Sequence, residues 1–93
     1  MIRRFKGDWA PAVFIGAFPR YFPANMVRTA RRKLEAVNAA AALEDLKAPP
    51  GNRLHALRGG REGQRAIRIN DQFRVCFIWR GNEACDVEIF DYH

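Results

Sequence analysis

The sequence predicts an α+β fold in which two N-terminal helices pack on a C-terminal antiparallel sheet. The apolar residues recur at helical spacing in the first half and alternate in the second half, and a Pro-Pro-Gly loop separates the two patterns. At 93 residues the chain fits one domain, which we expect to span residues 1–93. A hydrophobic content of 48%, with two Trp and seven Phe, is enough for a packed core.

The N-terminal part contains segments for one strand and two helices. Met1–Phe5 is a candidate edge strand, and a short helix is expected within Asp8–Phe18. Pro11 is compatible with this helix because it falls in the first turn, where its missing N–H would have no partner. The second helix is expected to run from about Pro23 to about Ala42.

The second helix has the clearest pattern. Its apolar residues form one stripe of an amphipathic helix: Val27, Ala30, Leu34, Val37 and Ala41. Its other faces carry Arg28, Arg31, Arg32 and Lys33. A solvated helix face is the commoner meaning of such a charged run, and contact with RNA or an acidic partner is the alternative. Leu43–Leu46 can add a turn before Ala48–Asn52, a loop rich in Pro and turn residues.

Three strands are expected after that loop, in Arg65–Ile69, Phe73–Trp79 and Cys85–Ile89. Alternate residues in each strand should share one face. In the first strand this set is Ile67 and Ile69; in the second it is Phe73, Val75, Phe77 and Trp79; in the third it is Cys85, Val87 and Ile89. The connections at Asn70-Asp71 and at residues 80–83 are short enough to make both pairings antiparallel hairpins.

Positive charge is concentrated in the C-terminal half, although the whole chain carries only +6. Residues 53–80 have a net charge of +5, from two acids against seven arginines: Arg53, Arg58, Arg61, Arg65, Arg68, Arg74 and Arg80. Residues 81–93 contain four acids and no Lys or Arg. A basic surface beside an acidic end indicates that one face holds a polyanion. Ordinary scattered surface charge is the alternative reading of composition alone.

Several site classes are not expected. Cys76 and Cys85 fall in predicted strands without the C-x-x-C spacing of a zinc or redox site, so both should be plain buried thiols. No stretch approaches the roughly 20 apolar residues of a membrane span, and no apolar run follows the charged N-terminus. We therefore expect a cytoplasmic protein with no membrane partner, no metal and no cofactor.

Several motifs, in order, resemble HigB-type toxins of the RelE/ParE toxin–antitoxin superfamily. They are Ile2–Lys6, Pro49–Leu54, His55–Gly59 with Arg61–Gly63, Ile67–Phe77 and Asp86–His93. The resemblance implies a RelE-like fold, ribosome-dependent cleavage of mRNA and neutralisation by a HigA-type antitoxin with a helix-turn-helix DNA-binding domain. The 70S ribosome with its mRNA would then be the target, and operator DNA would be bound only through the antitoxin.

The resemblance also indicates site residues. The residues that match those associated with cleavage in active members are His55, Asp91, Tyr92 and His93. Arg58 stands where a basic residue serves in the family, and Arg74 matches a basic strand residue beside the site. We add four RNA-binding candidates from the basic stretch: Arg53, Arg61, Arg65 and Arg68. The chain departs from the family at Gly60, which replaces an Asp, and at Gln64–Ala66, which lacks an aromatic found in some members.

These residue types permit RNA cleavage without a metal. The neighbouring 2′-OH can attack the phosphorus if one group takes its proton, another protonates the leaving oxygen and cations stabilise the phosphorane. We interpret His93 and Asp91 as sharing the acid and base roles, His55 as orienting or transferring a proton, and Tyr92 as stacking on a base. His55 can approach Asp91 only if the strand after Leu54 meets the last strand.

The arginine side chain presents a fixed fork of donors that matches phosphate oxygens, so Arg58 and Arg74 are expected to stabilise charge. Together these assignments predict a metal-independent mRNA endoribonuclease. Two other classes stay open: a ParE-like poison of DNA gyrase, or a module that only binds its antitoxin and nucleic acid. A structural protein with a basic surface is a further alternative. The C-terminal Asp91–His93 favours the nuclease.

Overall fold

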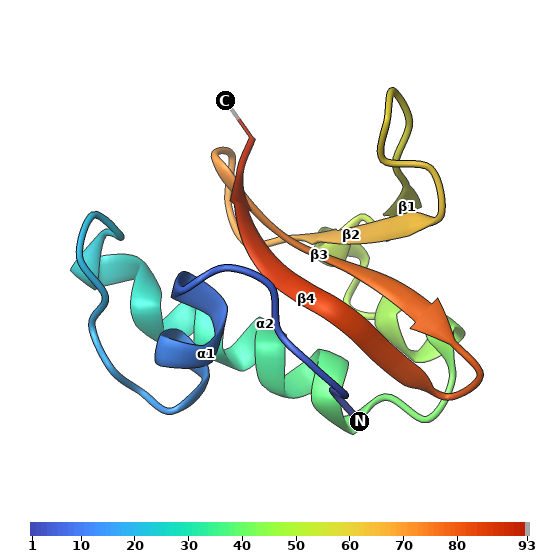
Figure 1. Ribbon diagram of the computed structural model, residues 1–93, viewed down its shortest axis with the longest axis horizontal. Helices are drawn as coiled ribbons and strands as arrows, with labels where there is room; N and C mark the ends of the chain where they lie inside the picture. The colour runs from blue at the N-terminus through green and yellow to red at the C-terminus, as the bar shows by residue number, and fades with distance from the viewer. Residues whose placement is uncertain (93) are drawn as a thin grey trace.

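In the computed structural model, which describes residues 1–92, helices lie on one side of a curved four-stranded sheet (Figure 1). The α-helices are α1 (Trp9–Phe14) and α2 (Val27–Ala39). The strands follow one another across the sheet in chain order, and each pairs with the next in antiparallel orientation: β1 (His55–Ala56), β2 (Gln64–Arg68), β3 (Phe73–Arg80) and β4 (Glu83–Asp91). The predicted α+β class with an antiparallel sheet is confirmed, with four strands instead of three.

Helix α1 lies within the predicted segment but ends at Phe14. Pro11 sits in its first turn, as expected. Gly16 has a φ of +85°, and its N–H donates to the Val13 carbonyl at 2.9 Å. The chain thus leaves the helix through a left-handed conformation that glycine adopts without strain, which explains why the helix stops before Phe18.

Helix α2 is shorter than predicted at both ends. A 3₁₀ turn, η1 (Ala24–Met26), precedes it, and Ala40 is already extended with a ψ of 128°. The buried residues of α2 confirm most of the predicted stripe: Val27, Ala30, Leu34 and Val37. Ala41 follows the end of the helix and is exposed, whereas Ala40 is buried, so placing Ala41 on the stripe is wrong. No helix within residues 1–92 combines the length and the apolar content needed to cross a membrane.

Two further 3₁₀ turns, η2 (Leu43–Lys47) and η3 (Pro50–Asn52), connect α2 to the sheet. The first matches the turn expected from Leu43. Asn52 is fully buried and donates to the carbonyls of Leu46 at 3.1 Å and Ala48 at 3.2 Å, while Lys33 Nζ donates to its Oδ1 at 2.6 Å. These bonds hold the loop against α2. The prediction of two helices was therefore incomplete, because 3₁₀ turns extend the helical layer.

The N-terminal segment lies beside β4 without forming the predicted edge strand Met1–Phe5. It makes two isolated parallel bridges, Ile2 with Ala84 and Phe5 with Val87. The bridges lie on either side of an irregularity in β4, which interrupts the hydrogen bonding that a continuous strand needs.

That irregularity is a β-bulge at Asp86, whose φ is +50°. The register between β3 and β4 shifts between Cys76 and Ile78, so β4 has one extra residue at this point. Beyond the bulge Cys85 pairs with Ile78 and shares its face. The prediction that Cys85 faces the same side as Val87 and Ile89 is therefore wrong, because the alternation restarts at the bulge.

The core fills the space between the helices and one face of the sheet. The buried sheet residues in this core are Ile67, Ile69, Phe73, Val75, Phe77, Ala84, Val87 and Ile89. Phe73 belongs to an aromatic cluster, with its ring centroid 4.9 Å from that of Phe22 and 5.8 Å from that of Trp9. The sheet face opposite this core carries a smaller buried cluster of Leu57, Ala66 and Cys76, with Phe90 packed against it.

Both cysteines are buried free thiols, as predicted. Burial is the largest influence on Cys76, and it raises the pKa of this thiol to about 11. Because the thiolate is the reactive form, Cys76 is chemically inert at neutral pH.

The bulge residue Asp86 anchors the N-terminal segment through an ion pair with Arg4, whose Nε lies 2.6 Å from Asp86 Oδ1. This hydrogen bond lowers the pKa of Asp86 below its ordinary value of 3.8. Because the folded-state pKa is the lower one, the pair stabilises the fold above the unfolded-state pKa. That stabilisation is lost as the pH falls through the folded-state value.

We expect Asp86→Asn to lower the melting temperature slightly at neutral pH, and we expect this difference from the wild type to close at about pH 2. Asn tolerates a positive φ as Asp does, so the variant removes the charge and keeps the bulge. Thermal unfolding of both proteins at the two pH values measures the effect. A difference that did not change with pH would assign it to the backbone instead of the ion pair.

Candidate functional site

The candidate site lies on the sheet face opposite the core, named here the open face. The strand residues that define it are Ala66, Arg74, Cys76, Glu88 and Phe90. Register places them on one side, because Ala66 pairs with Cys76, which pairs with Glu88, and Arg74 pairs with Phe90. The C-terminal end of β4 and the connection from β1 to β2 both rise on this side, away from α1 and α2 (Figure 1).

His55 begins β1 and pairs with Ala66, so it shares the open face. The side chain is exposed, and its Nδ1 lies 2.7 Å from the Arg53 carbonyl oxygen. A carbonyl only accepts hydrogen bonds, so Nδ1 carries the hydrogen and Nε2 of the neutral ring carries a lone pair. His55 thus presents a proton acceptor at the edge of the open face.

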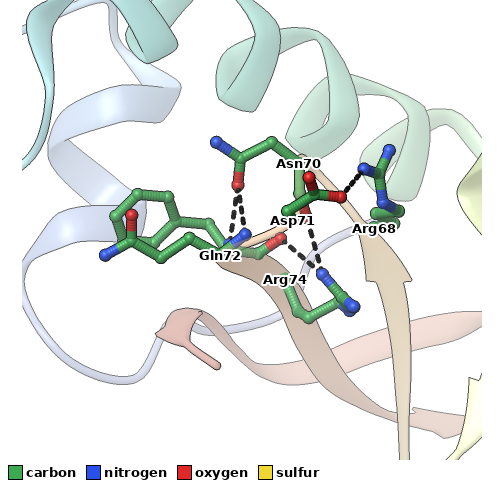
Figure 2. Close-up of polar contacts among 6 residues, drawn as sticks. Arg68, Asn70, Asp71, Gln72 and Arg74 are labelled. Atoms are coloured by element: carbon green, nitrogen blue, oxygen red, sulfur yellow. Dashed lines mark hydrogen bonds and ion pairs between the residues drawn. The ribbon is translucent and has the colours of Figure 1, made fainter. Parts of the chain in front are cut away.

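The turn between β2 and β3 fixes the position of Arg74 (Figure 2). Asn70 Oδ1 accepts hydrogen bonds from the backbone N–H groups of Gln72 at 2.9 Å and Phe73 at 2.7 Å, which is the side-chain turn that Asn favours. Arg74 Nη1 then donates to the carbonyls of Asn70 at 2.7 Å and Phe73 at 3.3 Å. Within residues 1–92 the Nε–H and Nη2 hydrogens of Arg74 make no hydrogen bond, so they can serve an external acceptor.

Tyr92 lies beside Arg74 at the end of β4. The Arg74 guanidinium carbon is 4.8 Å from the centroid of the Tyr92 ring, and the Tyr92 N–H donates to the Gln72 carbonyl at 2.6 Å. The Tyr92 ring is also 6.2 Å from that of Phe90, and about half of the residue is exposed. The structure therefore brings together a fixed guanidinium and an exposed aromatic ring.

The side chain of Asp91 lies on the face of β4 opposite to that of Tyr92. It pairs with Phe73, which belongs to the core, so by register Asp91 lies on the helix-facing side of β4. Gln72 Nε2 donates to its Oδ2 at 3.2 Å. His93, the fourth residue of the predicted cleavage set, lies outside the described residues.

The condition for His55 to approach Asp91, that their two strands are adjacent, is not met. β1 and β4 form opposite edges of the sheet, with β2 and β3 between them. Three strand spacings separate their axes by about 14 Å. The strand after Leu54 pairs with the next strand along the chain, so a substrate would have to span the open face to contact both residues.

Arg61 ties the β1–β2 connection to the open face. Its Nη1 donates to Glu88 Oε1 at 3.0 Å and to Gln64 Oε1 at 2.9 Å, and its guanidinium carbon is 4.1 Å from the Phe90 ring centroid. The Glu88 carboxylate compensates its charge within the protein. Arg61 is thus built as an anchor for this connection, although the sequence presented it as one more exposed cation.

The same connection contains Gly60 in a left-handed conformation. Gly60 has a φ of +87°, and its N–H donates to the Glu62 carboxylate at 3.1 Å. Hydrogen bonds from its own backbone N–H and then from that of Gly60 lower the pKa of Glu62. Glycine adopts this left-handed conformation without strain.

The other arginines differ in their availability. Arg53 and Arg58 are exposed and make no side-chain hydrogen bond or ion pair with any residue from 1 to 92. Arg65 pairs with Phe77 of the core, so by register it lies on the helix-facing side, away from the open face. Arg53 and Arg58 are therefore the two of this group that offer unpaired charge beside His55.

Arg68 is the last residue of β2 and pairs with Arg74, so by register it shares the open face. Its guanidinium pairs with Asp71 in the β2–β3 turn (Figure 2). The pKa of Lys33 on α2 is lowered by burial first and then by the charges of Arg32 and Arg68. Its charge is thus partly compensated by Asp71.

Four residues that the sequence reading did not select shape the site: Asn70, Gln72, Glu88 and Phe90. The sequence contained a signal for the turn residue Asn70 and for the two strand residues Glu88 and Phe90. Asn at a predicted hairpin turn commonly bonds the backbone two residues on, and strand residues that alternate with core residues must face the other side. The contacts of Glu88 and Phe90 with Arg61 could not be predicted, because they depend on the pairing of the strands.

The arrangement combines a proton acceptor at His55, a fixed guanidinium at Arg74 and an aromatic surface at Tyr92. These groups suit the binding of a phosphate and a nucleobase and the transfer of a proton. Among the side chains from residue 1 to residue 92, no three His, Cys, Asp or Glu form a group that could hold a metal ion.

Comparison with known proteins gives consistent matches. The chain is 43% identical over 80 residues to toxin HigB-1 of Vibrio cholerae, covering 85% of this chain and 84% of that protein. It is 28% identical over 93 residues to endoribonuclease HigB of Proteus vulgaris, covering all of both chains. It is 33% identical over 62 residues to an uncharacterized protein of Haemophilus influenzae, covering 67% of this chain and 61% of that protein.

A family model covers almost the whole chain. The model for the RelE-like toxin of the type II toxin–antitoxin system HigB matches residues 3–93. This match, together with the 43% identity to a HigB toxin, assigns the RelE-like fold to the layers described above and an antitoxin as the partner of the chain. The protein belongs to the HigB-like toxins of type II toxin–antitoxin systems.

Proposed function

We propose that this toxin is a ribosome-dependent mRNA endoribonuclease that inhibits translation and growth. The observation that carries the proposal is Arg74, whose guanidinium is fixed by two carbonyls and by Tyr92 on the same sheet face as His55. Preorganised donors of this kind stabilise charge that develops during a reaction. The Proteus vulgaris relative, which matches along its whole length, is named an endoribonuclease and supports the reaction class.

The proposed reaction uses the RNA's own 2′-OH as the nucleophile. The 2′ oxygen forms a bond to the adjacent phosphorus while the bond from phosphorus to the 5′ oxygen breaks, which leaves a 2′,3′-cyclic phosphate and a 5′-OH. A base removes the 2′ proton, and an acid protonates the leaving 5′ oxygen. This chemistry needs no metal when protein cations stabilise the phosphorane charge, so we propose a metal-independent mechanism.

In this proposal Arg74 binds the scissile phosphate through Nε–H and Nη2–H, the fork that matches two phosphate oxygens. Tyr92 stacks on a neighbouring base. His55 transfers a proton through Nε2, and the resemblance adds Asp91 and His93 as further acid–base candidates at the end of β4.

The remaining arginines have different proposed roles. Arg53 and Arg58, exposed beside His55, contact the RNA backbone, and such phosphate contacts weaken with salt. Arg61 holds the β1–β2 connection in place through Glu88. We include Arg65 only as an outer contact with the ribosome, because register directs it away from the open face. Arg68 shares the open face by register, but Asp71 partly compensates its charge, so we include it as a weaker RNA contact.

Arg74→Ala is expected to slow cleavage of ribosome-bound mRNA by about a hundredfold, and Arg74→Lys should lose somewhat less because it keeps the charge without the fork. The assay uses purified 70S ribosomes that carry a translated mRNA. New 5′ ends are mapped relative to the A site, and the upstream fragments are tested for a cyclic phosphate.

Arg80→Ala is the matched control, because Arg80 is an exposed arginine at the other end of the same strand. It should cut like the wild type. If the wild type arrests growth and cuts no mRNA with or without ribosomes, the nuclease proposal is abandoned. DNA gyrase would then be the next target to test, as for a ParE-like toxin of the same fold.

We also propose that residues 1–93 act as a single toxin domain and that the antitoxin is of the HigA type with a helix-turn-helix domain. Operator DNA would be contacted through that antitoxin. These assignments, like a cytoplasmic location, rest on the family resemblance. Sequencing the neighbouring gene tests the partner directly.

A further inference from the structure

A second surface lies on the helical layer, apart from the open face. It is a groove of about 620 Å³ between the α1–α2 connection and the N-terminal half of α2, named here the α2 groove. Its lining includes Phe18, Val27, Arg28, Arg31, Arg32 and Glu35. The α1–α2 connection lies at the left of Figure 1, and the β1–β2 connection rises at the upper right. The groove is therefore distinct from the candidate nuclease site.

Large apolar side chains are exposed in the segment that borders this groove. Phe18 is 70% exposed, and Ile15 and Tyr21, which flank it in sequence, are 76% and 85% exposed. In the described part of the chain five large hydrophobic residues are exposed, and these three fall within seven consecutive positions. Exposed apolar side chains that gather in one segment often mark a surface that contacts a partner.

Positive charge surrounds the apolar part of the α2 groove. Arg28 and Arg32 are exposed, and neither side chain makes a hydrogen bond or ion pair within residues 1–92. Arg31 is held in place, because its Nε donates to the Phe14 carbonyl at 3.1 Å and lies 3.9 Å from Glu35 Oε2. Two exposed cations that are unpaired among the described residues, beside a held one, complement acidic side chains.

The same lining argues against nucleic acid as the occupant. Glu35 places a carboxylate in the groove, where it would repel a continuous row of phosphates. A peptide can set acidic side chains against Arg28 and Arg32 and an apolar side chain against Phe18 and Val27, and it can leave the position beside Glu35 uncharged. The groove thus fits a segment of mixed acidic and apolar character.

We propose that the α2 groove is the docking surface for an acidic amphipathic segment of the antitoxin. This inference rests on the antitoxin partner that family membership provides, and it does not depend on nuclease activity. An apolar anchor of the segment covers Phe18, and its carboxylates pair with Arg28 and Arg32. The charged run on α2 is then an interaction surface and not a solvated face alone.

The test measures the affinity of the full-length toxin for its cognate antitoxin, purified after co-expression from the operon. Phe18→Asp and the double variant Arg28→Glu with Arg32→Glu should each weaken binding roughly thirtyfold or more, as expected for central contacts. Lys47→Glu, a charge reversal at an exposed residue of η2 outside the groove, should bind like the wild type.

Folding of each variant is checked by its melting temperature, and Phe18→Ser with Arg28→Ala serves as a milder second variant. Weaker binding by folded groove variants, with Lys47→Glu unchanged, supports the proposal. Unchanged binding overturns it. Normal antitoxin binding with loss of ribosome binding would also overturn it, because the α2 groove would then contact ribosomal RNA. The binding measurement stays valid even if the toxin cuts no mRNA.

Discussion

Phe73→Ala is expected to lower the free energy of unfolding by about 3–5 kcal/mol, because it removes a large side chain from a site that cannot easily collapse. Phe73 is only 2% exposed, and its ring contacts those of Phe22 and Trp9. Its strand also begins at the turn that fixes Arg74. For a domain of this size such a loss is a large part of the total stability and lowers the melting temperature by roughly 12 °C or more.

Phe18→Ala is the matched control, since Phe18 is an exposed residue of the same type. Its effect should stay within about 0.5 kcal/mol. Chemical denaturation of the three proteins, with equal m-values required, compares their free energies of unfolding. Equal stability of the two variants would mean that the aromatic cluster does not organise the core.

The sequence was sufficient for the features that depend on local periodicity. The helical stripe from Val27 to Val37 and the alternation from Phe73 to Trp79 both appear as predicted, because each pattern is set by one buried face. The register after Asp86 was not predictable in this way. A polar residue such as Asp86 is compatible with an outward position whether or not the strand contains a bulge. Only the pairing of β3 with β4 shows that the bulge is there.

Strand β1 was absent from the three predicted strand ranges for a related reason. It has two residues, His55 and Ala56, and it exists because β2 provides a partner. A segment this short carries no periodicity to detect. The sheet therefore gained a fourth strand at the position of a predicted site residue.

For the site, the sequence indicated which residue types are present but not where each side chain lies. Sequence reasoning selected Arg74 and Tyr92, which do lie together. It grouped Asp91 with Tyr92, although neighbouring strand residues point to opposite faces. It also treated Arg61 as a free cation, because its partner Glu88 lies 27 positions away along the chain. Pairing across the sheet decides which charges stay available to a ligand.

The role of His55 can be resolved by comparing His55→Ala with His55→Asn. The asparagine amide stands at the position of Nδ1 and can still donate to the Arg53 carbonyl, but it cannot accept the proton of a 2′-OH. If His55 transfers a proton, both variants should slow single-turnover cleavage on ribosomes by about 10²–10⁴-fold. If it only orients the chain, His55→Asn should keep most of the activity.

His93→Ala belongs in the same experiment, because the acid and the base of one reaction act as a unit. Each single variant should lose about 10²–10⁴-fold in rate, and the double variant with His55→Ala should lose little more than the worse single one. Losses that multiply would indicate independent contributions, such as RNA binding by one residue. Normal cleavage by His93→Ala would remove it from the mechanism and leave proton transfer to His55 and its neighbours on the open face.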